Sequence, residues 1–158
     1  MKTLVLGLGN TLLGDEGVGV YAIRRMQETL GVSGDVAILD GGTLSFTLAG
    51  PIEDADNLII IDAAQLNDAP GTVRLYEGEE MDRFVTTNNK SSVHEVSLAD
   101  LMVIAHLTDK LPKQRALIGI QPQSLDWSHN MTPAVAEAVP TACELAHELI
   151  TRWTQPSA

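Results

Sequence analysis

The chain has 158 residues, of which 44% are hydrophobic and 20% charged, and its formal net charge is −11. This length supports one domain with one core, and the acidic balance argues against nucleic acid, which basic faces bind. The single cysteine, Cys143, excludes an internal disulfide. The first residues hold neither a signal peptide nor the ~20 apolar residues of a membrane span. We therefore expect one domain over 1–158 in a cytoplasmic monomer that binds neither nucleic acid nor membranes.

Four short apolar runs predict buried β-strands, because they are rich in Val, Ile and Leu and are bounded by glycine or acidic residues. They cover residues 3–8, 36–39, 58–61 and 116–120. A fifth run, residues 72–76, alternates apolar and polar side chains and follows Pro70-Gly71. This run is typical of an edge strand or a hairpin partner.

Helical spacing predicts a first helix after the first strand, where apolar residues recur every four positions from Val18 to Leu30. Gly31 then occupies the position of a left-handed C-cap. The last helix is expected to begin at Thr132, the N-cap, followed by Pro133, and to run to Trp153. Pro140 should kink or split it.

A further helix is expected to begin near Ser92, since Ser92 and Glu95 form a capping-box pattern ahead of an apolar stripe. His94 would then lie in the first turn of that helix. Residues 78–91 read as one long irregular segment, either a mobile flap or a connector. Strands that alternate with helices predict an α/β three-layer sandwich, with a mostly parallel five-stranded twisted sheet and helices on both faces.

The turn after the first strand resembles a phosphate-binding loop but departs from both known patterns. Leu12 stands where the dinucleotide motif requires glycine, and Asp15 stands where the P-loop requires lysine. Asp15 and Glu16 would also repel a pyrophosphate at the helix N-terminus. Nucleotide binding remains an alternative because Asp40 ends the second strand, as a ribose-binding acid would; protection against thermal unfolding by a dinucleotide would test it.

Three side chains are candidate metal ligands: Glu16 after the first strand, Asp62 at the end of the third, and His94. In a parallel sheet, strand ends and the loops beyond them meet at one edge, and Asp40 belongs to the same edge. Two carboxylates and an imidazole suit nickel, zinc, iron or manganese, with coordination positions left open. The structural alternatives are that Asp15 is only an N-cap, and that Glu16 is only a first-turn acid favoured by the helix dipole.

Other familiar catalytic patterns are missing from the sequence. His106, His129 and His147 have no comparable placement, and Cys143 reads as a small buried hydrophobic residue. Neither a G-x-S-x-G elbow nor an H-E-x-x-H motif occurs.

Over nearly its whole length the sequence resembles the nickel-iron hydrogenase maturation endopeptidases. The matching segments are Gly-Leu-Gly-Asn at 7–10, Gly-Asp-Glu-Gly-Val-Gly-Val at 14–20, Asp-Gly-Gly-Thr at 40–43, Ile-Asp-Ala at 61–63, Val-His-Glu at 93–95, Leu-Ala-Asp-Leu at 98–101, and Gly-Ile-Gln-Pro at 119–122 with Ser124 and Leu125.

The resemblance implies that Glu16, Asp62 and His94 bind nickel, which the substrate supplies. That substrate would be the precursor of a hydrogenase large subunit, from which the enzyme removes a short C-terminal extension once nickel is installed. Positioning of the peptide would lower the barrier, Glu16 and Asp62 would serve catalysis as well as binding, and Asp40 is the candidate general base. The alternative is a nickel checkpoint or delivery protein that binds the precursor without cutting it.

Overall fold

The computed structural model describes residues 1–30, 34–87 and 97–154. Its strands are β1 (Thr3–Leu8), β2 (Val36–Gly42), β3 (Asn57–Ala63), β4 (Val73–Glu77) and β5 (Gln114–Ile120). Its helices are α1 (Val18–Leu30), α2 (Ala49–Asp54), α3 (Glu79–Thr87), α4 (Leu98–Leu107) and α5 (Pro133–Thr154). Two 3-10 helices, η1 (Gly14–Gly17) and η2 (Phe46–Leu48), precede α1 and α2.

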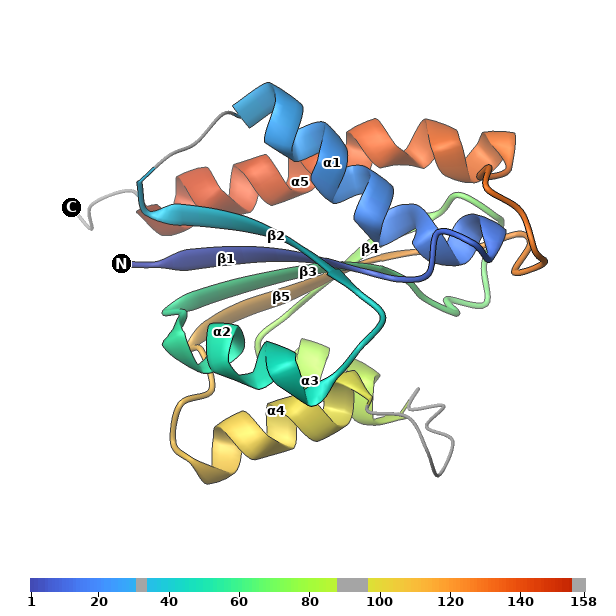
Figure 1. The fold of residues 1–158 in the computed structure, drawn as a ribbon. Helices are drawn as coiled ribbons and strands as arrows, with labels where there is room; N and C mark the ends of the chain where they lie inside the picture. Colours follow the sequence, from blue (N-terminus) through green and yellow to red (C-terminus); the bar gives the residue numbers. More distant parts are fainter. Residues whose placement is uncertain (31–33, 88–96, 155–158) are drawn as a thin grey trace.

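The five strands form one sheet in the order β2-β1-β3-β5-β4 (Figure 1). β1 pairs in parallel with both β2 and β3, and β3 pairs in parallel with β5. β4 is antiparallel to β5 at one edge, which confirms the edge-strand prediction. Because four strands run the same way, β1, β2, β3 and β5 all end at one side of the sheet, here called the carboxyl edge.

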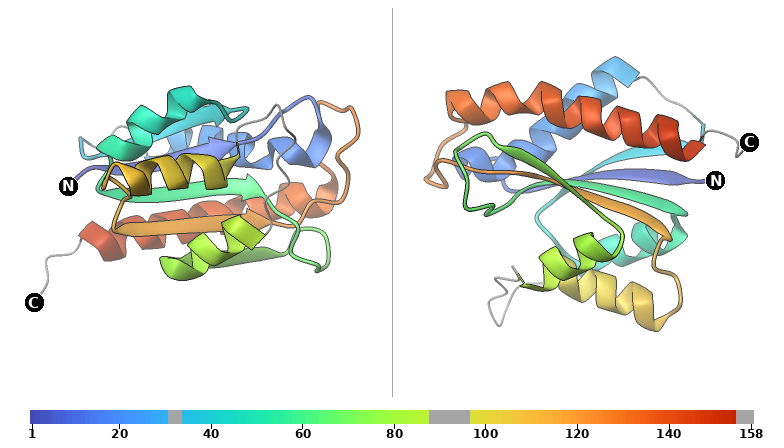
Figure 2. Two further views of the ribbon diagram at one scale, coloured as in Figure 1. Left: turned by 90° about the horizontal axis from the view of Figure 1, so that it is seen from below. Right: turned by 180° about the vertical axis from the view of Figure 1, so that it is seen from behind.

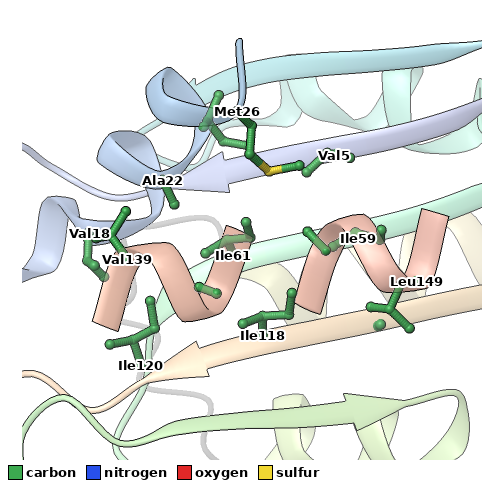
Figure 3. Close-up of a cluster of buried hydrophobic side chains, with 14 of the residues drawn as sticks. Val5, Val18, Ala22, Met26, Ile59, Ile61, Ile118, Ile120, Val139 and Leu149 are labelled. Carbon is green, nitrogen blue, oxygen red and sulfur yellow. The ribbon is translucent and has the colours of Figure 1, made fainter. Parts of the chain in front are cut away.

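Helices cover both faces of the sheet, so the predicted three-layer fold is confirmed. Helices α1 and α5 lie on one face, and α2, α3 and α4 lie on the other (Figures 1 and 2). Alternation along the strands gives each face of the sheet its own core. Val5 and Ile59 pack against α1 and α5 (Figure 3). Leu6 and Ile60 belong to the core on the other face. Strands buried on both faces explain the continuous apolar runs in the sequence.

The two predicted helices on the first face are present. Helix α1 spans Val18–Leu30, although Gly31, its expected C-cap, lies outside the described residues. Helix α5 begins at Pro133 and continues through Pro140 as one helix, so the chain is not split there. None of the helices in the described ranges is long and apolar enough to cross a bilayer.

Two predictions about the second face are wrong. The stretch 78–91 is not irregular throughout, because Glu79–Thr87 form α3, which buries Met81 and Val85 one helical turn apart. The next helix begins at Leu98 instead of near Ser92, and its capping box joins Ser97 to Asp100. Ser92 and Glu95 themselves lie outside the described residues.

Candidate active site

Asp62 lies at the carboxyl edge, where β3 leaves the core. It is paired with Gly119 of β5 and follows Ile61, which is fully buried. Ile60 packs in the core beneath α2, α3 and α4, and Asp62, two positions on, has the same strand parity. Asp62 is half-buried, and the alternation directs its side chain to the sheet face that α2, α3 and α4 cover.

Glu16 is brought to the same edge by very close packing of the chain around η1. A Cβ atom at Gly19, in the first turn of α1, would come within 2.1 Å of the Ile61 carbonyl oxygen. A Cβ atom at Gly9, just after β1, would come within 1.9 Å of the Glu16 carbonyl oxygen. Only glycine permits these approaches, so the sequence itself fixes η1 against the end of β3.

The two carboxyl groups interact electrostatically. Burial raises the pKa of Asp62 well above its ordinary value of 3.8, and the charge of Glu16 raises it further, while the Ala63 N–H partly offsets both effects. The negative charge of Glu16 therefore disfavours the ionised form of Asp62. A cation bound between them would relieve that repulsion, which is the chemistry predicted for the pair.

Asp40 reaches the carboxyl edge but not the same position. It lies in β2 opposite Gly7 of β1, which in turn pairs with Ile61, so two strand spacings, about 10 Å, separate Asp40 from β3. A Cβ at the neighbouring Gly41 would point to the Leu6 side chain, so alternation directs Asp40 to the opposite face from Asp62. Its carboxylate is exposed and accepts a hydrogen bond from the Gly42 N–H at 3.0 Å.

His94, the third candidate ligand, lies outside the described residues. In the described residues no group of three or more His, Cys, Asp or Glu side chains could hold a metal ion. The structure thus brings Glu16 and Asp62 together, and the three-ligand set stays a prediction. In the sequence His94 lies between α3 and α4, and these two helices cover the sheet face toward which Asp62 points (Figure 1).

Asp15 has a different role from the N-cap that its position suggested. It is fully buried inside η1, and its carboxylate accepts hydrogen bonds from the N–H groups of Gln123, Ser124 and Thr132. Burial alone would raise the pKa of Asp15, but these bonds and the one from the Thr132 hydroxyl hold it below 3.8. Asp15 therefore ties the loop between β5 and α5 to the turn that carries Glu16.

The same turn has its backbone donors occupied. The Gly14 N–H donates to the Ser128 carbonyl at 3.0 Å and the Asp15 N–H to the Ser124 carbonyl at 3.0 Å. The Glu16 N–H donates to the Leu13 carbonyl at 3.2 Å. A phosphate at this turn would need these N–H groups, so the structure argues against the nucleotide alternative.

Gln121 is a second residue whose role the sequence did not reveal. It is 7% exposed, and its Oε1 accepts the Leu66 N–H at 2.6 Å while its Nε2 donates to Gln65. It therefore holds the chain that leaves Asp62. Its motif, Gly-Ile-Gln-Pro, was a signal of resemblance, but the partners of Gln121 are 55 and 56 residues away and are not readable from sequence.

The remaining titratable candidates lie elsewhere. His106 and His147 are in α4 and α5, and His129 is in the loop after β5, as expected. Cys143 is half-buried against the α1–α5 core and lines a groove of about 440 Å³ between these helices. Burial raises the pKa of its thiol, which makes it a poor nucleophile.

Comparison with known proteins defines the class of this fold and site. The chain is 38% identical over 145 residues to the hydrogenase 2 maturation protease of Escherichia coli, covering 91% of this chain and 87% of that protein. It is 37% identical over 153 residues to the hydrogenase expression/formation protein HupD of Bradyrhizobium diazoefficiens, covering 96% and 79% respectively. The solved structure of the hydrogenase maturating endopeptidase HybD from E. coli superimposes with a TM-score of 0.90 at 35% identity, covering 98% of this chain and 94% of that one.

The fold and site therefore define the class of α/β endopeptidases to which that solved structure belongs. A family model described as HycI, hydrogenase maturation protease, matches residues 20–149. The chain therefore belongs to the hydrogenase maturation protease family and is an enzyme that hydrolyses peptide bonds.

Proposed function

We propose that the protein removes a short C-terminal extension from the nickel-loaded precursor of a nickel-iron hydrogenase large subunit. In this proposal the nickel is part of the substrate and serves as the recognition element. Family membership supports the maturation role, and the names of the similar proteins include hydrogenase 2 maturation protease and hydrogenase maturating endopeptidase.

One observation carries the nickel part of the proposal: Glu16 and Asp62, 46 residues apart in sequence, are electrostatic neighbours at the carboxyl edge. Their oxygen donors, with an imidazole from His94, form a hard-to-borderline set that suits a divalent first-row metal such as nickel. The donor chemistry therefore fits the proposed recognition element.

The proposed mechanism relies mainly on positioning. Glu16, Asp62 and His94 hold the metal end of the precursor and so fix the scissile peptide against the carboxyl edge, an effect worth up to ~7–11 kcal/mol of barrier. The nickel, when bound, supplies Lewis acidity toward the peptide carbonyl or the attacking water. Asp40, at the same edge and two strand spacings from β3, is the proposed general base.

The test is mass analysis of the precursor after incubation with the protein, with and without nickel. We expect shortening only of the nickel-loaded precursor, and loss of at least 100-fold in rate for Glu16→Gln, Asp62→Asn and His94→Ala. Asp54→Asn, which changes an exposed acid at the end of α2, away from the carboxyl edge, is the matched control and should keep the wild-type rate.

Each contrary result removes a defined part of the proposal. Equal cleavage of nickel-free precursor would overturn nickel recognition but leave the peptidase role. Tight binding without any loss of mass would favour the non-cleaving checkpoint protein. Near-normal turnover by Asp40→Asn would remove Asp40 from the mechanism.

A further inference from the structure

Three large hydrophobic side chains lie in water at the carboxyl edge, close to the turn that carries Glu16. Leu12 is 44% exposed, Leu125 is 53% exposed and Trp127 is 79% exposed. We call these three residues the Trp127 patch. Globular proteins rarely leave such side chains together in water unless they form a binding surface.

Two segments far apart in the sequence lie side by side at the patch. The Ser128 N–H donates to the Leu12 carbonyl at 2.9 Å, and Leu13 and Ser128 form an isolated parallel β-bridge. Figure 2 shows the loop between β5 and α5, in orange, running beside the turn that follows β1. Leu12 therefore lies next to the loop that presents Leu125 and Trp127.

Hydrogen bonds to η1 and α1 hold the loop between β5 and α5 in place. The Asp15 carboxylate accepts hydrogen bonds from Ser124 on one side of the patch and from Thr132 on the other. Tyr21 of α1 donates its hydroxyl to the His129 carbonyl at 2.7 Å. These hydrogen bonds fix both ends of the loop, so the exposed Trp127 lies on a segment with a fixed backbone.

We propose that the Trp127 patch is the docking surface for the protein substrate, where it contacts an apolar area of the precursor beside the cleaved peptide. The proposal rests on the proposed function. Its main support is continuity with the active site: Leu12 directly precedes the turn that holds Glu16, which is closed by the hydrogen bond from the Glu16 N–H to the Leu13 carbonyl. A protein whose peptide bond lies against Glu16 and Asp62 therefore has its own surface next to the patch.

The composition of the patch fits a protein partner. Tryptophan is enriched at the centres of protein interfaces, where uncharged polar groups surround the apolar anchor. In the sequence, Thr11, Ser124 and Ser128 are the polar residues next to the patch residues, and Asp126 is the charged one. An apolar surface of the precursor satisfies this arrangement better than a highly charged one.

The kinetic test compares Trp127→Ala and Leu125→Ser with Leu107→Ser. Leu107 is 77% exposed at the end of α4, away from the carboxyl edge, and is the matched control. We expect the patch variants to raise KM for the nickel-loaded precursor at least tenfold with kcat within twofold of wild type, and Leu107→Ser to change neither. Wild-type KM in both patch variants would overturn the proposal, whereas an inactive wild-type protein would overturn the proposed function instead.

A binding test needs no cleavage. The chain has two tryptophans, and Trp153 is only 8% exposed, so protein labelled with 5-fluorotryptophan gives one exposed and one buried ¹⁹F signal. Trp127→Phe identifies the exposed signal. Unlabelled precursor should shift that signal and remove its H₂O/D₂O isotope shift; an unchanged signal at saturating precursor would overturn the proposal. A dimer in light scattering that Trp127→Ala abolishes would assign the patch to a second copy of the chain and also overturn it.

Discussion

Asp15 and Thr132 are joined by two hydrogen bonds although 117 residues separate them in the chain. The Thr132 N–H donates to Asp15 Oδ1 at 2.7 Å, and the Thr132 hydroxyl donates to Asp15 Oδ2 at 2.8 Å. The pair fastens the start of α5 to the turn that carries Glu16. Stability and site geometry therefore depend on the same buried carboxylate.

Asp15→Asn should destabilise the protein by about 1.5–3 kcal/mol, because an amide nitrogen cannot accept the bonds that one carboxylate oxygen accepts, and buried N–H groups lose their partner. Urea unfolding measures the change. Asp126→Asn, exposed in the same loop, should stay within ~0.5 kcal/mol of wild type. Equal stability of the two variants would show that the Asp15 bonds do not hold the loop.

The pH dependence of stability should also identify Asp15. Its pKa in the folded protein is below 3.8, so its contribution is present above that value and is lost as the pH falls through the lowered pKa. Wild-type protein should therefore lose stability more steeply in acid than Asp15→Asn does. Parallel acid limbs for the two proteins would contradict the expected shift.

Asp62 should show the opposite sign. Its folded pKa is raised above 3.8, so its contribution is full at low pH and is lost as the pH rises through the raised pKa. Asp62→Asn should remove this loss and, without metal, stabilise the protein at neutral pH by about 0.5–2 kcal/mol while abolishing cleavage. In carbon NMR titrations, Glu16→Gln should lower the pKa of the Asp62 carboxyl; an unmoved titration would show that the two groups do not interact.

Gly19→Ala should disrupt the packing that positions Glu16. The added methyl would meet the Ile61 carbonyl oxygen at 2.1 Å and the Leu8 carbonyl oxygen at 2.5 Å, both backbone atoms. Overpacking of this kind costs about 1–3 kcal/mol or more, measurable by thermal unfolding.

Gly50→Ala is the control for Gly19→Ala. Gly50 lies in α2 and an added Cβ there would meet nothing within 4 Å. That variant should be stabilised by up to about 1 kcal/mol, since alanine favours a helix more than glycine does. Similar effects of both substitutions would contradict the packing account.

Arg115→Lys should lose most of the interaction that holds α3 to β5. Arg115 donates Nε to Asp82 Oδ1 at 2.8 Å and Nη2 to Asp82 Oδ2 at 2.5 Å, a two-point geometry that lysine cannot reproduce. We expect a loss of about 1–2 kcal/mol on unfolding. Arg74→Lys, at the exposed pair with Asp68, should change stability by less than ~0.5 kcal/mol, and an equal loss there would argue against the two-point geometry.

The sheet could be predicted because its strands are buried on both faces. The run Leu58 to Ile61 is fully apolar, and each of its side chains is fully buried. Helix α1 could be predicted because its buried side chains recur every four residues, at Val18, Ala22 and Met26.

The helices α2 and α3 on the second face were harder to predict, because they are short and contain few apolar residues. Helix α3 buries Met81 and Val85 within a segment rich in acids and threonines, so its pattern looked irregular. Helix α2 contains Gly50 and Pro51, which usually indicate a turn, and it was not expected.

The candidate site was predicted in part. Placement at strand ends correctly brought Asp62 and Glu16 to one edge, because parallel strands end together. Asp40 was expected at the same edge as Glu16 and Asp62, but its distance from them could not be predicted. The sequence does not show that β1 lies between β2 and β3. The role of Asp15 was missed because its hydrogen-bond partners follow β5, far along the chain.

The order of the strands has a consequence for how the molecule folds. Asn57 of β3 and Thr3 of β1 are neighbours in the sheet but lie 54 residues apart in the sequence. On its other side Asn57 pairs with Gln114 of β5, which is also remote in the sequence. Pairings between such remote segments must overcome a large loop-closure entropy before contacts reward it, so folding should be slow for a chain of this size. During synthesis the part of the sheet that α5 covers stays exposed until α5 has been made, and this apolar surface favours aggregation in that interval.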